Sequence, residues 1–167
     1  LEIKIALNLS NIYAIGIVMK KRALCIVAHP DDETIWMGGT ILQNKEWDWT
    51  IIALCRKSDP DRAPKFANVC KKYGASSVIS DMEDDILNPL RIVDVVKIIK
   101  QNLPIEEYDY IFTHGENGEY GHVRHLETHK AVTWMVENKV LKCEKLFHFA
   151  YVSGNVVMSQ DSESRIP

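Results

Sequence analysis

The alternation of short apolar runs with longer helical patterns constrains the fold of this chain more than any other feature. The run ALCIVA at Ala23–Ala28 is apolar throughout, which is typical of a strand covered on both faces. Similar runs predict further strands at Trp49–Leu54, Ser77–Ser80, Tyr108–Thr113 and Lys145–Val152. Helical patterns separate them, at Glu33–Lys45, Arg62–Tyr73, Leu90–Leu103 and from about His122 to Asn138. This order predicts an α/β fold with a mostly parallel sheet and helices on both faces.

Composition places the chain among ordinary globular proteins. It has 167 residues, of which 46% are hydrophobic and 26% charged, values that exclude a disordered or collagen-like chain. Lys and Arg number 20 against 23 Asp and Glu, so the net charge of -3 argues against a nucleic-acid or anionic membrane partner. No apolar stretch reaches the ~20 residues of a membrane span. The 4 cysteines form no C-x-x-C pair, which favours reduced thiols in a cytoplasmic protein.

The two ends of the chain differ in character from its middle. Residues 1–18 precede Met19, where a basic stretch followed by a strand forms a more natural beginning. Residues 1–18 are either an added upstream stretch or a real extra strand or arm, and the sequence leaves both alternatives open. We expect a single domain over residues 19–158 and a polar, frayed tail over residues 159–167.

Two polar clusters directly follow predicted strands. One is His29–Glu33 (HPDDE), after the first strand, and the other runs from His114 to His125, after the fourth. In sheets of this kind, ligands bind beyond the carboxyl ends of the strands. The two clusters therefore meet in one crevice if the first and fourth strands are neighbours in the sheet.

These clusters contain the side chains of a catalytic zinc site. His29 and Asp32 lie across a tight turn and can reach one metal ion, and His125 supplies a second imidazole. Two imidazoles, one carboxylate and an open position for water are typical of catalytic zinc, which lowers the pKa of its bound water to about 7. Asp31 is then placed to act as the general base. His122, one helical turn before His125, would donate to an oxyanion or to a leaving amine.

Each of these residues also has a plainer interpretation. The aspartates of the first cluster would cap the next helix, and His122 and His125 would be solvated at a helix start. His129 follows His125 at the i, i+4 spacing of a helical metal pair, but residue 126 is not the glutamate of such motifs, so we expect a structural role. We expect the same of His114. The acidic run at residues 81–85 predicts a solvated loop.

Two motifs, AHPDDE at Ala28–Glu33 and GEYGHVRH at Gly118–His125, resemble those of the PIG-L/LmbE-like zinc N-deacetylases. Enzymes of that family remove acetyl groups from N-acetylglucosamine units attached to larger molecules. The resemblance covers roughly residues 20–151 and implies a Rossmann-like three-layer sandwich. It also implies roles for single residues, which are zinc ligation by His29, Asp32 and His125, base catalysis by Asp31, and transition-state stabilisation by His122.

The resemblance extends to the substrate, with two departures. Relatives often place a substrate-contacting arginine after the second strand, and Arg62 is the better positional match, while Tyr120 adjoins the metal site and is expected to shape the pocket. Arg124 stands where the family commonly has Asp, and a cation there would depress the pKa of nearby imidazoles. The chain is also shorter than many relatives, which implies either a different substrate or a pocket completed by a second copy in a homo-oligomer.

The sequence thus predicts a zinc-dependent hydrolase that removes the acetyl group of an N-acetylglucosamine-type small molecule. In this scheme metal-bound hydroxide hydrolyses the amide and Asp31 is the general base. Another divalent ion, such as Fe²⁺, would serve the same ligands. The alternative is a non-catalytic, metal- or sugar-binding member of the same fold.

Overall fold

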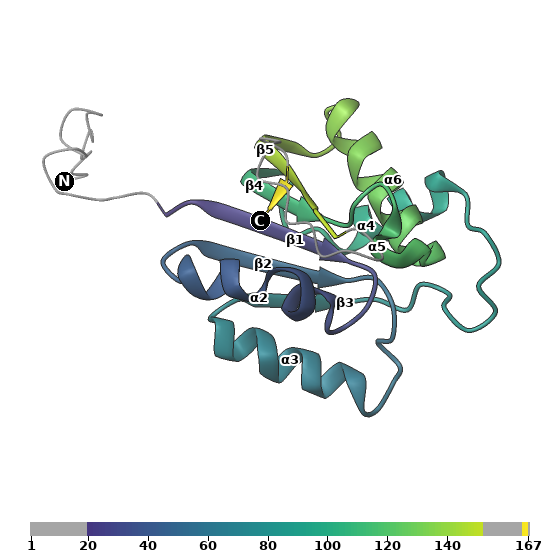
Figure 1. Ribbon diagram of the computed structural model, residues 1–167, viewed down its shortest axis with the longest axis horizontal. Helices are drawn as coiled ribbons and strands as arrows, with labels where there is room; N and C mark the ends of the chain where they lie inside the picture. Colours follow the sequence, from purple (N-terminus) through teal and green to yellow (C-terminus); the bar gives the residue numbers. More distant parts are fainter. Residues whose placement is uncertain (1–19, 152–164, 167) are drawn as a thin grey trace, which may run out of the picture.

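The computed structural model describes residues 20–151 and 165–166, and residues 1–18 therefore lie outside the described residues. A six-stranded sheet has the strand order β3-β2-β1-β4-β5-β6, and every pair of neighbours is parallel (Figure 1). The strands are β1 (Arg22–Val27), β2 (Asp48–Ala53), β3 (Ser76–Ile79), β4 (Glu107–Thr113), β5 (Lys142–Phe149) and β6 (Arg165–Ile166). The helices are α2 (Asp32–Gln43), α3 (Arg62–Tyr73), α4 (Ile92–Asn102), α5 (Gly118–Gly121) and α6 (Val123–Glu137). The predicted α/β fold is confirmed.

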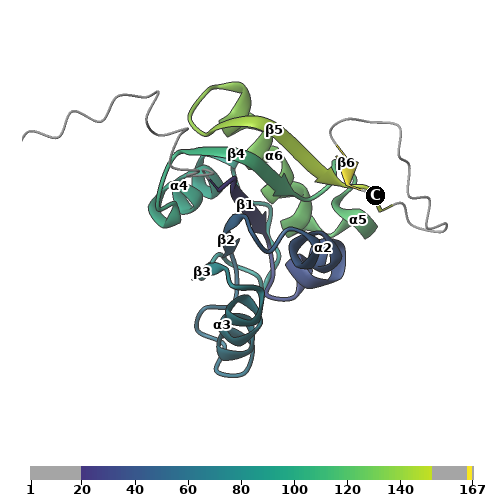
Figure 2. The same ribbon diagram turned by 90° about the vertical axis from the view of Figure 1, so that its left-hand side faces the viewer.

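Two apolar cores lie on the two faces of the sheet, which makes three layers. Leu24 and Ile26 of β1 pack on one face with side chains of α4 and α6, while Cys25 and Val27 pack on the other with α2 and α3. Figures 1 and 2 show these helix pairs on opposite sides of the strands. The interior positions of β1 are fully buried because both faces are covered, which explains its unbroken apolar run.

Helix α3 illustrates how local sequence sets an element. It spans Arg62–Tyr73, as predicted, and buries Phe66, Cys70 and Tyr73. Gly74 ends it in the left-handed conformation, with φ 73, and its N–H donates to the carbonyl groups of the last turn. Glycine adopts this conformation without a Cβ penalty, so the predicted C-cap is confirmed.

The C-terminal strands differ from the prediction. Strand β5 begins at Lys142 and ends at Phe149, whereas the apolar pattern placed it at Lys145–Val152. Strand β6 lies within the expected frayed tail, and it adds Arg165–Ile166 to the edge of β5 by parallel pairing. Backbone hydrogen bonds to an open strand edge do not depend on an apolar pattern, so two polar-tail residues can join the sheet.

Strands β1 and β4 are neighbours at the centre of the sheet, paired from Ala23 opposite Tyr110 to Ile26 opposite Thr113. Their carboxyl ends therefore meet at one edge, which fulfils the condition for a shared crevice. Within residues 20–151 and 165–166, no helix combines the length and the hydropathy needed to cross a lipid bilayer.

Candidate metal centre and active site

The turn after β1 brings His29 and Asp32 together. The backbone N–H of His29 donates to Oδ2 of Asp32 at 2.8 Å, which closes the turn. Asp31, the N-cap of α2, has φ 118 and ψ -27. A residue with a Cβ rarely adopts this conformation, so the turn holds backbone strain at the predicted general base. The three polar side chains are consequently grouped at the carboxyl end of a central strand.

The segment after β4 supplies His125. A Cβ at Gly115 would lie 2.6 Å from the carbonyl oxygen of Phe149, so the chain can pass there only as glycine. His122 then caps α6, since its Nδ1 accepts a hydrogen bond from the N–H of Arg124 at 3.2 Å. His125 lies in the first turn of α6 and is fully buried.

Three ligand atoms from the two segments form a nearly regular triangle. Nδ1 of His29 lies 3.2 Å from Nε2 of His125, and each of these atoms lies 3.4 Å from Oδ2 of Asp32. Ligands bound tetrahedrally at 2.0–2.1 Å are roughly 3.3–3.4 Å apart. The spacing and the His₂Asp donor set therefore fit a divalent ion such as zinc. The structure brings together all three residues predicted as ligands.

Glu119 joins the two buried imidazoles of this region. Its Oε2 lies 2.7 Å from Nδ1 of His125 and 2.8 Å from Nδ1 of His114. Because the carboxylate accepts the Nδ1 proton of His125, Nε2 keeps a lone pair for a metal ion. The backbone of Glu119 has φ 60 and ψ -69, a strained conformation that these hydrogen bonds hold in place.

The ring of His114 packs against the ring of His125. Its Nε2 accepts a hydrogen bond from the N–H of Ala28 at 2.9 Å, and its ring stacks on that of His125 with centroids 3.9 Å apart. Both ring nitrogens of His114 are therefore engaged. His129 and His148 donate from Nδ1 to the carbonyl oxygen of His114 at 2.9 and 3.1 Å, so all three histidines have structural contacts.

The electrostatics of the site favour charged carboxylates and a neutral His114. Burial alone would raise the pKa of Asp32, but hydrogen bonding to His29 and the imidazoles of His114 and His125 hold it well below its usual range. Burial also opposes ionisation of Glu119, yet the hydrogen bonds from His114 and His125 lower its pKa to about 2. Burial depresses the pKa of His114. Deprotonated ligands are the state that binds a metal ion.

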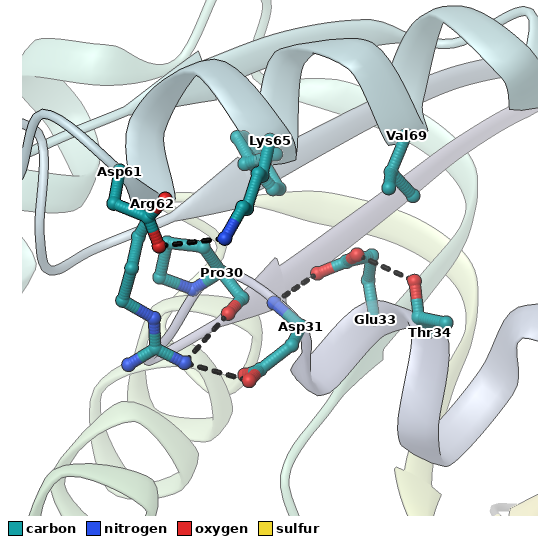
Figure 3. Close-up of a pocket in the computed structure, with 9 residues that line it drawn as sticks. Pro30, Asp31, Glu33, Thr34, Asp61, Arg62, Lys65 and Val69 are labelled. Atoms are coloured by element: carbon teal, nitrogen blue, oxygen red, sulfur yellow. Dashed lines mark hydrogen bonds and ion pairs between the residues drawn. The ribbon is translucent and has the colours of Figure 1, made fainter.

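Asp31 lies beside the triangle, half exposed, and is paired with Arg62. Oδ2 of Asp31 accepts a hydrogen bond from Nη2 of Arg62 at 2.6 Å, and the same Nη2 donates to the carbonyl oxygen of Pro30 at 3.1 Å (Figure 3). Burial raises the pKa of Asp31 and outweighs the opposing effect of Arg62. A raised pKa makes this carboxylate a stronger base.

His122 lies beside the two imidazoles of the triangle. Its ring centroid is 4.7 Å from that of His29 and 4.8 Å from that of His125. Burial, together with the charges that His29 and His125 can carry, lowers the pKa of His122. The neutral ring then carries its proton on Nε2, because Nδ1 accepts the N–H of Arg124.

These residues open into a pocket of about 270 Å³ at the carboxyl edge of the sheet. Arg62 and Tyr120, the predicted substrate-contacting residues, both line it. The full lining is His29, Asp31, Asp32, Ile35, Trp36, Arg56, Arg62, Asp84, Tyr120 and His122. A second pocket of about 320 Å³ lies between α2 and α3 and shares Asp31 and Arg62 with the first (Figure 3).

Arg124 does not act on the imidazoles in the expected way. Its fully buried side chain donates to the carboxylates of Glu83 and Glu127 and to the carbonyl oxygen of Asn88. The pKa of His122 is depressed by burial and by neighbouring imidazoles instead. Two carboxylates neutralise the guanidinium, which therefore serves as a link between α6 and the loop after β3.

The acidic run after β3 contains a site residue that the sequence pattern missed. The side chain of Asp84 is only 6% exposed, and Oδ1 lies 3.0 Å from Nε2 of His29. The expectation of a solvated loop is wrong for this residue, because its buried carboxylate is paired with His29 and with the partly exposed Arg56. A run of acidic residues in the sequence does not show which of them is buried, so Asp84 could not be identified from the pattern.

Comparison with known proteins agrees with the motifs. Residues 24–136 match the family described as PIG-L, GlcNAc-PI de-N-acetylase. The chain belongs to the PIG-L family. The predicted resemblance to this family is confirmed.

This PIG-L family member is also similar to individual proteins. It is 29% identical over 121 residues to uncharacterized protein L374 of Acanthamoeba polyphaga mimivirus, in a match covering 64% of this chain and 54% of that protein. The chain thus spans about half the length of this curated relative. The solved structure of GalB, the 4-carboxy-2-hydroxymuconate hydratase from Pseudomonas putida KT2440, matches at 18% identity and a TM-score of 0.47, covering 70% of this chain and 55% of that one.

Proposed function

We propose that this chain is a zinc-dependent N-deacetylase that hydrolyses the acetamide of an N-acetylglucosamine-type small molecule. The observation that carries the proposal is the triangle of His29, Asp32 and His125, with ligand atoms 3.2–3.4 Å apart beside an unliganded carboxylate, Asp31. A divalent ion held there supplies Lewis acidity and an activated water. Family membership and the four free thiols support a hydrolase of the reducing cytoplasm.

The chain's own residues supply the remaining chemistry. Asp31 accepts a proton from the attacking water, and the new C–O bond forms on the acetyl carbon. His122 donates from Nε2 to the carbonyl oxygen as negative charge develops there. When the C–N bond breaks, the leaving nitrogen takes the proton held by Asp31, so acetate and a free amine are released.

The pocket suits a single sugar ring with polar groups at its rim. Arg62 and Arg56 offer donors to hydroxyl groups, and the half-exposed ring of Tyr120 offers an apolar face. Arg62 is held by Asp31 and Pro30, so a substrate bound to it would lie next to the general base.

The proposal is tested by acetate release from a panel of N-acetylglucosamine derivatives. The protein is stripped with a chelator and then assayed with no metal, with zinc and with Fe²⁺. We expect release only with metal. If no derivative releases acetate although the protein holds stoichiometric metal, the chain is instead a non-catalytic metal- or sugar-binding member of the fold.

A further inference from the structure

Asp84 differs from its acidic neighbours in what its carboxylate contacts. Its side chain is 6% exposed, whereas that of Asp85 is 84% exposed. Oδ1 of Asp84 lies 3.0 Å from Nε2 of His29, and Oδ2 accepts a hydrogen bond from Nε of Arg56 at 2.8 Å. Asp85 contacts Nη1 of Arg56 at 2.9 Å, on the outer side of the same guanidinium. Two adjacent aspartates thus share one arginine, and one of them reaches a predicted metal ligand.

The contact with Asp84 decides which nitrogen of His29 can bind a cation. An ionised carboxylate only accepts hydrogen bonds, so Nε2 of His29 carries the proton. Nδ1 then keeps its lone pair, and this is the atom that lies 3.2 Å from Nε2 of His125. Glu119 acts on His125 in the same way through Nδ1, at 2.7 Å. Each imidazole of the triangle therefore has its own carboxylate partner.

The loop that carries Asp84 is itself fastened to the rest of the site. Arg124 donates to the carbonyl oxygens of Glu83 and Asn88, which lie on either side of Asp84. Glu127, one turn further along α6, accepts the backbone N–H of Leu90. Helix α6 thus carries one ligand, His125, and also fixes the loop that orients the other.

We propose that Asp84 is a positioning residue that holds His29 in the Nε2–H tautomer and thereby sets the affinity of the site for a divalent cation. The inference rests on the metal centre of the proposed function. Carboxylate partners of metal-bound histidines change metal affinity by 10–100-fold when they are removed. Asp84 donates no ligand atom to the triangle and acts only through His29.

Zinc affinity, measured by competition with a chromophoric chelator, tests the proposal. We expect Asp84→Ala to weaken zinc binding roughly 10–100-fold. Asp84→Asn keeps an oxygen that can accept from His29, so it should restore part of the loss. Asp85→Ala is the matched control, because it removes the adjacent carboxylate and a contact of the same Arg56, and its affinity should stay within about two-fold of the parent chain. Equal affinities of Asp84→Ala and Asp85→Ala would overturn the proposal.

A second measurement needs no variant. Long-range ¹H–¹⁵N spectra of the zinc-loaded parent chain report which nitrogen of His29 carries the proton. A proton on Nε2 is expected, and a proton on Nδ1 would overturn the proposal even if Asp84→Ala fails to fold. A parent chain that binds no divalent metal would overturn both this inference and the proposed function. A zinc affinity that is unchanged in Asp84→Ala would overturn the inference alone.

Discussion

Arg124 on α6 is ion-paired with Glu83 in the loop after β3, and its guanidinium is completely buried. The same side chain pairs with Glu127, one turn along the helix. One buried positive charge therefore lies between two carboxylates, of which Glu127 is buried and Glu83 is partly exposed. This link joins the helix that carries His125 to the loop that carries Asp84.

Replacing Arg124 with Met should destabilise the protein strongly. The substitution leaves the buried carboxylate of Glu127 without its cation, and breaking a buried pair in this way costs about 3–5 kcal/mol. The free energy of unfolding in urea measures the effect. Arg91→Met is the control, because Arg91 pairs with Asp94 but is 78% exposed, so the loss of stability should be much smaller. Similar losses in the two variants would contradict a structural role for Arg124.

Asp31→Asn should separate catalysis from metal binding. Asp31 lies outside the ligand triangle, so zinc affinity should remain within a few-fold of the parent chain. An amide cannot accept the proton of the attacking water, so the rate of acetate release should fall roughly 10²–10⁴-fold. Asp61→Asn makes the same charge change in the neighbouring pocket, beside Arg62, and should retain activity. An active Asp31→Asn protein would exclude Asp31 as the base.

His125→Ala should remove most of the bound metal. The substitution takes away one corner of the triangle and leaves only His29 and Asp32 as ligands. Metal content is measured by elemental analysis after dialysis against zinc at a fixed free concentration. His129→Ala, four residues along the same helix, is the comparison, since His129 donates to the carbonyl oxygen of His114 and should leave the zinc content unchanged. Zinc lost equally from both would favour a helical His125–His129 pair instead.

The sequence was sufficient for the fold because the central strands β1 and β2 are buried on both faces. Runs such as Ala23–Ala28 are apolar throughout, so the sequence identifies them as buried strands. Helix α3 ends before Gly74, as predicted. Strand β5 was misplaced because Lys142–Phe149 is partly exposed near the edge of the sheet, so its start carries polar residues that do not resemble a strand.

The sequence predicted only those site residues that lie close together along the chain. His29, Asp31 and Asp32 share one turn, and His122 and His125 share one helix start, so two short motifs were enough to name them. Asp84 contacts His29 although the two residues are 55 positions apart in the sequence, and Arg124 contacts Glu83 at a separation of 41 positions. Such pairs depend on how a loop crosses the edge of the sheet, and no local pattern encodes that path.

Glu119→Gln should change the pH dependence of stability in the metal-free protein. The folded pKa of Glu119 is about 2, against a model-peptide value of 4.5, because His114, His125 and the N–H of Gly115 donate to its carboxylate. A depressed folded pKa means that the carboxylate stabilises the protein above pH 4.5 and that this contribution is lost as the pH falls toward 2. Linkage limits the contribution to about 3 kcal/mol.

The difference in unfolding free energy between the parent chain and Glu119→Gln is therefore expected to be largest near pH 5 and to shrink as the pH falls below 4.5. Urea titrations in the presence of a chelator, at intervals between pH 5 and the lowest pH at which both proteins remain folded, measure this difference. Glu144→Gln alters a carboxylate whose side chain is 59% exposed and paired with Lys21, so its effect on stability should be small and should serve as the control. A difference for Glu119→Gln that stays constant across this range would mean that the stabilisation comes from packing of the side chain rather than from its charge.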